Sequence, residues 1–105
     1  MSRGRLAGPS AAPATAERTD EVARIRNLLI EEIVTGTADT TVDYRQEQDE
    51  WVVVLSGSAE LEVAGEAVTL RSGDWVLLPA ETSHRLVRVE PGTQWLAVHL
   101  FPDAR

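Results

Sequence analysis

The sequence predicts an all-β fold in which about eight short strands form a two-sheet sandwich or a barrel. From Asn27 onward, β-branched residues are frequent and apolar side chains follow the two-residue period of strands. Turn residues recur about every eight to twelve positions, at Gly36 and at residues 56–58, 64–66, 72–74 and 91–92. Strands this short and this evenly spaced are typical of sandwiches and barrels.

The strands are expected, in chain order, over residues 28–35, 40–45, 50–56, 59–63, 67–70, 75–78, 84–89 and 95–101. Within the third, Glu50 shares a face with Val52 and Val54, while the opposite face is also apolar. We therefore expect this strand to be covered on both sides, as in a closed or double-sheet structure.

The N-terminal region has a different pattern. Residues 1–16 are rich in Ala, Pro, Gly and Ser, with Leu6 as their only large apolar side chain, which predicts a disordered tail. Over residues 17–26, Thr19 precedes two acidic residues, and Val22 and Ile25 lie three apart. This pattern predicts one or two helical turns. Residues 17–105, which include this segment, are expected to form a single domain.

A chain of 105 residues fits one domain with a thin core, to which we expect the three tryptophans to contribute much of the volume. Association of two copies would add buried surface. We therefore expect a homodimer formed through the outer faces of the strands.

Composition excludes several classes of function. Without cysteine there is no disulfide and no thiolate ligand or nucleophile, and without lysine there is no Schiff-base chemistry. The net charge is −7, made up of +2 in residues 1–26 and −9 in residues 27–105, which argues against nucleic acid as a partner. No apolar run is long enough to span a membrane, and no secretory signal pattern is present, so a cytoplasmic protein is expected.

Two segments go beyond general strand patterning. In residues 44–57, Glu50 is followed by Gly57 seven positions later, and in residues 73–84, Gly73 is followed by Pro79 and then by His84. These spacings resemble the two motifs of the cupin superfamily. The resemblance covers residues 27–101. It implies a cupin-type double-stranded β-helix, a jelly-roll barrel, with a flexible N-terminal tail.

The chain also departs from the superfamily pattern. Where the first cupin motif usually has two histidines, this sequence has Tyr44 and Gln46. Glu81 replaces the small residue usual two positions after the proline, and Arg88 stands where the second motif often ends in asparagine. The chain is similar to small bacterial single-domain cupins with a Tyr-x-Gln-x-x-Asp-Glu-Trp signature.

The resemblance implies a site inside the barrel, with Glu50 and His84 as catalytic groups. Tyr44 and Gln46 would join them as ligands of a divalent metal, either Zn, Fe, Ni or Mn. Such a protein would bind a small molecule and, if an enzyme, would be a metal-dependent isomerase, lyase or oxygenase. The loss of two imidazoles weakens the expected metal affinity, so a metal-free binding or sensory module is the alternative. A third possibility is an interaction scaffold whose cavity is filled by Trp and Val side chains.

Each candidate also has a purely structural interpretation. His84 would then be a buried histidine bonded to a neighbour, and Glu50 would pair with an arginine, namely Arg45, Arg85 or Arg88. His99 shares a face with Trp95 on the last strand and is either a second imidazole near the cavity or a packing residue. Trp51 and Trp75 either pack a core or dimer face, or stack on a substrate. The role of Glu81 is left open.

Overall fold

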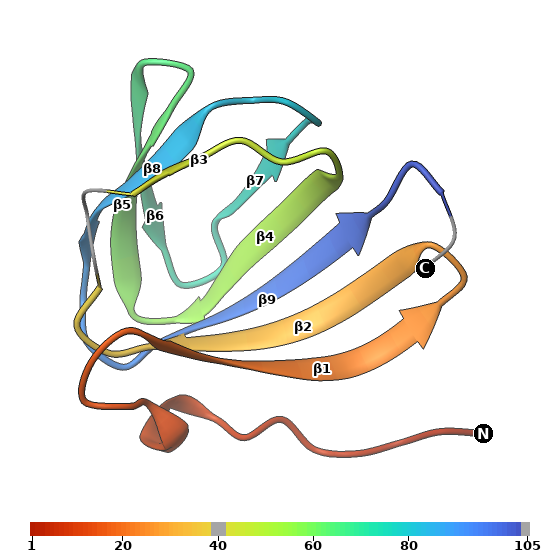
Figure 1. Cartoon of the computed structure of the whole chain (residues 1–105). Coiled ribbons are helices and arrows are strands. Elements are labelled where there is room, and N and C mark those ends of the chain that lie inside the picture. Colours follow the sequence, from red (N-terminus) through yellow and green to blue (C-terminus); the bar gives the residue numbers. More distant parts are fainter. Residues whose placement is uncertain (39–41, 104–105) are drawn as a thin grey trace.

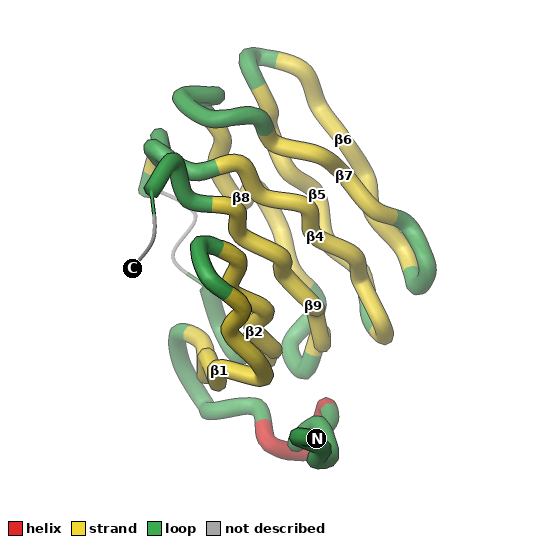
Figure 2. The backbone as a smooth tube through the Cα atoms, turned by 90° about the vertical axis from the view of Figure 1, so that its right-hand side faces the viewer, coloured by secondary structure: helices red, strands yellow, loops and turns green. Residues whose placement is uncertain are grey.

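A computed structural model describes residues 1–38 and 42–103, which form two sheets of antiparallel strands facing each other (Figure 1). One sheet has the order β1 (Glu17–Ile25), β2 (Leu28–Thr35), β9 (Thr93–Leu100), β4 (Asp49–Ser56) and β7 (Trp75–Leu78). The other has the order β3 (Asp43–Tyr44), β8 (His84–Val89), β5 (Ser58–Val63) and β6 (Glu66–Arg71). The predicted all-β, jelly-roll architecture is confirmed. Viewed from the side, the strands of the larger sheet run next to one another (Figure 2).

The predicted strands are found close to their expected positions. β2, β7 and β8 begin and end where the sequence predicts, and four others differ at their ends by one or two residues. The strand predicted over residues 40–45 is observed as β3, and residues 40–41 lie outside the described part of the chain.

The helical turns predicted over residues 17–26 are wrong, because this segment is the edge strand β1. It pairs with β2 from Glu17 opposite Thr35 to Ile25 opposite Leu28, with a bulge between Glu21 and Ala23. A helix of one or two turns is marginal in water. The same residues gain a full ladder of backbone hydrogen bonds by joining the sheet.

The core between the sheets is built mainly from small and β-branched side chains. Its buried cluster consists of Val52, Val54, Ala59, Leu61, Leu70, Trp95 and Ala97. Of the three tryptophans only Trp95 is buried, whereas Trp75 is 59% exposed on the outer face of β7. The expectation that all three supply the core is therefore wrong. The outer face of β4 is only partly covered, since Trp51, Val53 and Leu55 are half-buried.

The N-terminal segment lies along the outside of the larger sheet, below β1 in Figure 1, and contains one 3₁₀ turn, η1 (Pro9–Ala11). The backbone N–H groups of Ala7 and Gly8 donate to the carboxylate of Glu32, which is only 2% exposed. The segment also passes so close to Gly36 that a Cβ there would overlap Pro13. Disorder of residues 1–16 in solution stays a prediction. Within the described residues no helix is long and apolar enough to cross a membrane, and the cytoplasmic location also stays a prediction.

Candidate functional site

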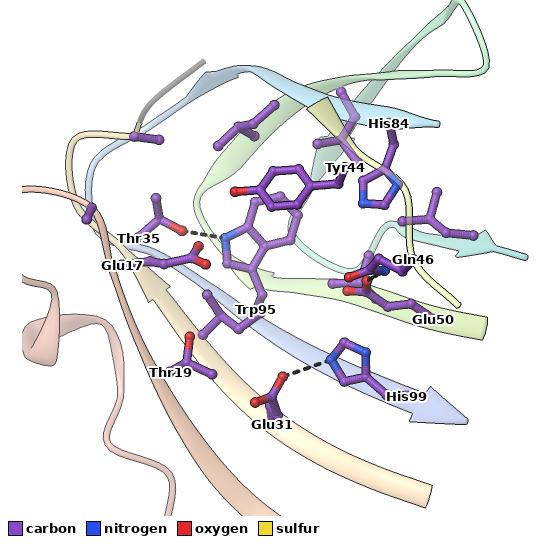
Figure 3. Close-up of a pocket in the computed structure, with 17 residues that line it drawn as sticks. Glu17, Thr19, Glu31, Thr35, Tyr44, Gln46, Glu50, His84, Trp95 and His99 are labelled. Atoms are coloured by element: carbon purple, nitrogen blue, oxygen red, sulfur yellow. Dashed lines mark hydrogen bonds and ion pairs between the residues drawn. The ribbon is translucent and has the colours of Figure 1, made fainter. Parts of the chain in front are cut away.

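A cavity of about 310 Å³ opens between the two sheets (Figure 3). Strand alternation brings residues from eight of the nine described strands to it, all except β6. The polar lining side chains are Glu17, Thr19, Glu31, Thr35, Tyr44, Gln46, Glu50, His84 and His99. The apolar wall includes Ile33, Val52, Leu61, Leu78, Leu86 and Trp95. All four residues predicted from the sequence motifs therefore lie in one cavity.

Glu50 reaches the cavity because it alternates with Val52 and Val54 on the inner face of β4. Glu50 is 9% exposed, and its Oε1 accepts a 2.8 Å hydrogen bond from Nε2 of Gln46. Within the described chain, Oε2 accepts no hydrogen bond, so it is available to a ligand. The structural interpretation of Glu50 as an arginine partner is not observed.

Two of the three arginines proposed as partners of Glu50, Arg45 and Arg85, pair elsewhere. Arg85 binds Glu62, and Arg45 lies 3.3 Å from the exposed carboxylate of Glu81. The backbone N–H of Glu81, which has a φ of 64°, donates to the carbonyl oxygen of Gln46. Glu81 therefore ties the loop that carries Gln46 to the loop between β7 and β8, and it does not line the cavity.

His84 enters from the opposite sheet, on β8. Its Nδ1 lies 3.1 Å from the carbonyl oxygen of Thr82. A carbonyl oxygen only accepts, so Nδ1 carries the proton and the neutral ring leaves Nε2 as an acceptor. Tyr44, the Cα partner of His84, stacks on the ring with centroids 5.6 Å apart. This stacking holds the imidazole in place at the cavity.

His99 is more fully tied to the protein than His84. Its Nε2 lies 2.8 Å from Oε1 of Glu31, and its Nδ1 lies 3.3 Å from Nε2 of Gln48. With the Gln48 amide in this orientation, Nδ1 accepts a hydrogen bond and Nε2 donates one. Both nitrogens are therefore occupied, and His99 orients Glu31 at the cavity rather than offering a free imidazole nitrogen.

Three carboxylates line this cavity from three strands, namely Glu17 on β1, Glu31 on β2 and Glu50 on β4. Although Glu17 remains an exposed residue, partial desolvation of its carboxyl group, together with repulsion from Glu50 and Glu31, raises its pKa above the usual value. The side chain of Glu17 makes no hydrogen bond or ion pair with the described residues. In Figure 3 its carboxylate points into the cavity, near Thr35 and Trp95.

Trp95 forms the inner wall of the cavity. Its indole N–H donates a 3.0 Å hydrogen bond to Oγ1 of Thr35, so the ring is fixed and leaves its apolar surface to the cavity. Trp51 and Trp75 do not line the cavity; they contact each other on the outer face, with centroids 6.1 Å apart. A substrate inside the barrel would therefore stack on neither. The cavity also remains open, which does not favour the scaffold whose interior is filled.

The residues present do not fit a tightly held transition metal. No group of three or more His, Cys, Asp or Glu side chains in the described part of the chain is arranged to hold a metal ion. Of the four predicted ligands, only Glu50 and His84 are strong donors, and the amide nitrogen of Gln46 faces Glu50. Catalytic zinc sites commonly use three such protein ligands.

Sequence reasoning missed Glu17, Thr19 and Glu31. The first two fell in the segment assigned to a helix, whereas in a strand Glu17 and Thr19 alternate onto one face. For Glu31, the sequence pattern does contain an indication of a site role. It shares its face of β2 with Leu29 and Ile33, and a lone carboxylate on an apolar face is unusual.

Comparison with known families gives a match to the cupin domain over residues 29–99. Among solved structures, a provisionally assigned mannose-6-phosphate isomerase from Ralstonia eutropha JMP134 is 34% identical, with a TM-score of 0.78. The match covers 93% of this chain and 99% of that one. No curated protein matches the chain.

Two further structures share the fold. KdgF from Halomonas sp. is 23% identical with a TM-score of 0.74, covering 81% of this chain and 78% of that one. SPY1581, a conserved protein of unknown function from Streptococcus pyogenes, is 19% identical with a TM-score of 0.76, covering 99% and 93%. At these identities the likeness concerns the architecture alone.

Proposed function

Because this chain belongs to the cupin family, we propose that its barrel cavity binds a small organic molecule and exchanges a proton with it through Glu50 and His84. The observation that carries the proposal is their arrangement. The two groups come from opposite sheets, line one cavity, and each keeps one acceptor atom unused by the described protein. Carboxylate and imidazole groups that line a concave, mostly apolar site are the usual candidates for acid–base chemistry.

The chemistry that these two acceptors suit is proton transfer between neighbouring atoms of a hydroxy-carbonyl compound. Nε2 of His84 takes a proton from the carbon next to the carbonyl group and returns it to the carbonyl carbon. Oε2 of Glu50 moves the hydroxyl proton to the former carbonyl oxygen. Positioned groups of this kind contribute roughly 10²- to 10⁴-fold to a rate.

The name of the Ralstonia protein supports the isomerase class of reaction, since such isomerases move a proton between adjacent carbons. It gives less support to a phosphorylated substrate. No arginine lines the cavity among the described residues, and the chain has no lysine. A phosphate group would therefore meet no cationic side chain in the cavity.

Incubation with D-mannose in D₂O tests the proposal. We expect deuterium to appear at C2 and in the ketose product by NMR, at a rate lowered about 100-fold or more in Glu50→Gln and in His84→Gln. Glu66→Gln, an exposed carboxylate on β6 away from the cavity, is the matched control. If wild-type protein exchanges no faster than both variants, the proton-transfer role is wrong.

Cupins often bind metal ions, and a metal held by Gln46, Glu50 and His84 is the second candidate. Nε2 of His84, unused by the described protein and in the same cavity as Glu50, supports it, although the donor set suits only weak binding. Elemental analysis of untagged protein decides the matter. Stoichiometric Zn, Fe, Ni or Mn that disappears in His84→Ala would support this candidate, and metal-free protein would contradict it.

We also propose that two copies associate through the outer face of the larger sheet. Large apolar side chains are exposed there on β1, β7 and β9: Ile25 is 60% exposed, Trp75 59%, Leu77 54% and Leu100 45%. Contiguous apolar surface of this kind usually marks an interaction site. A symmetric dimer would cover it on both copies at once.

A further inference from the structure

The cavity is rich in hydrogen-bond acceptors and negative charge. Glu17 has both carboxylate oxygens free of hydrogen bonds to the described residues, Glu31 and Glu50 each keep one, and His84 keeps Nε2. The donors on the same wall are hydroxyl and amide groups, which carry no charge. A ligand that fills this site must therefore supply donors.

The charges of the cavity are also unbalanced. Three carboxylates face a common space, and the lining residues among those described include no lysine or arginine to offset them. The neighbouring arginines are engaged outside the cavity, Arg45 with Glu81 and Arg85 with Glu62. Partly desolvated charges of one sign repel each other more strongly than they would in water.

We infer that the cavity takes a small organic cation, a molecule about the size of a hexose whose ammonium group lies among Glu17, Glu31 and Glu50. This inference rests on the proposed function and names its substrate class. An ammonium group supplies three N–H donors to the free carboxylate oxygens and removes their mutual repulsion. The hydrocarbon face of the molecule then lies against Trp95 and the aliphatic wall formed with Leu61 and Leu86.

The charge on Glu17 gives the inference a local probe. Its carboxylate has no partner in the described chain, so its loss removes ligand contacts without breaking a hydrogen bond of the fold. The raised pKa of Glu17 has the same origin as the proposed selectivity, namely partial desolvation and the nearby charges of Glu50 and Glu31. A bound cation would stabilise the ionised form of this carboxyl.

The experiment uses three probes that share one scaffold, D-mannosamine as the cation, D-mannose as the neutral compound and mannose 6-phosphate as the anion. Dissociation constants are measured by calorimetry at a pH that keeps the amine protonated. The indole N–H resonance of Trp95 reports whether binding occurs in the cavity. We expect mannosamine to bind at least about tenfold more tightly than mannose, and the phosphate most weakly.

Variants complete the test. Glu17→Gln should weaken mannosamine by about tenfold and mannose by clearly less, while Glu66→Gln, which removes the same charge at a distance, should change neither. Glu31→Gln is the second cavity variant if Glu17→Gln does not fold. Equal binding of mannosamine and mannose, or tightest binding of the phosphate, would overturn the inference and leave the proposed function standing. If none of the three shifts the Trp95 resonance, both fail.

Discussion

Carboxylates on the two faces of the five-stranded sheet differ in how fully they are hydrogen-bonded. On the outer face, Glu32 is 2% exposed and receives hydrogen bonds from the N–H groups of Ala7 and Gly8 and from the amide of Gln94. On the inner face, the adjacent residue Glu31 binds only one ring nitrogen of His99, and Glu17 binds no described group. The contrast arises because neighbouring residues of β2 point to opposite sides of the sheet.

The pKa directions agree with this contrast. Burial alone would raise the pKa of Glu32, yet the backbone N–H groups of Gly8 and Ala7 and the Gln94 amide lower it below 4.5. For Glu17 no hydrogen bond opposes burial, and its pKa is raised. A hydrogen-bonded buried carboxylate stabilises the fold, whereas one without partners does not. The carboxylate on the outer face is therefore fully hydrogen-bonded within the protein, whereas those on the inner face keep unused oxygens.

The largest effect is expected at the apolar part of the outer face. Trp75→Glu places a charge within the proposed dimer surface, on the edge strand β7, and should weaken association roughly thirtyfold or more. Analytical ultracentrifugation should show wild-type protein at twice the 11.5 kDa chain mass and the variant as a monomer. Ala67→Glu, on the exposed hairpin strand β6, is the control. A monomeric wild type at high concentration would refute the proposed dimer.

A smaller effect is expected where the N-terminal segment meets the outer face. Glu32→Gln replaces an acceptor oxygen by an amide group that cannot accept from all three donors, so unfolding should require about 1 to 3 kcal/mol less free energy. Folding lowers the pKa of Glu32 from its unfolded-state value of 4.5. Its stabilising contribution is therefore present above pH 4.5 and disappears as the pH falls through the folded-state pKa. Urea unfolding at neutral and acidic pH measures the loss of stability and its dependence on pH. The difference between wild type and variant should shrink in acid.

A control isolates the N-terminal segment. Glu21→Gln changes an exposed carboxylate on β1 whose contact is a surface ion pair with Arg24, and it should have little effect. In Glu32→Gln, limited proteolysis should cleave residues 1–16 faster than in wild type. Unchanged stability and unchanged cleavage together would show that the contacts of Glu32 contribute nothing in solution.

The sequence was sufficient to predict most strands, because alternation and turn residues act locally. It was also sufficient to place Tyr44, Gln46, Glu50 and His84 together, through the motif spacings of a known fold. It could not assign β1, since the strand pairing of residues 17–25 depends on β2 being available as an edge. The three-carboxylate cavity depends on that same long-range pairing, so Glu17 could not be predicted as a site residue.

The smallest effect is expected on the inner face and has the opposite sign. Glu17→Gln removes an ionised group whose charge is disfavoured by partial desolvation and by Glu50 and Glu31. It should therefore raise the free energy of unfolding at neutral pH. The increase should be at most about 1 kcal/mol, because the side chain remains partly solvated. A raised folded-state pKa means that the protonated form is favoured on folding. The destabilisation caused by the wild-type carboxylate is therefore absent below pH 4.5, the unfolded-state pKa. It grows as the pH rises toward and through the folded-state pKa. Thermal unfolding across this range should show the two proteins converging in acid and separating toward neutral pH. A variant less stable than wild type at neutral pH would mean that Glu17 has a stabilising partner, and the contrast between the two faces of the sheet would no longer hold.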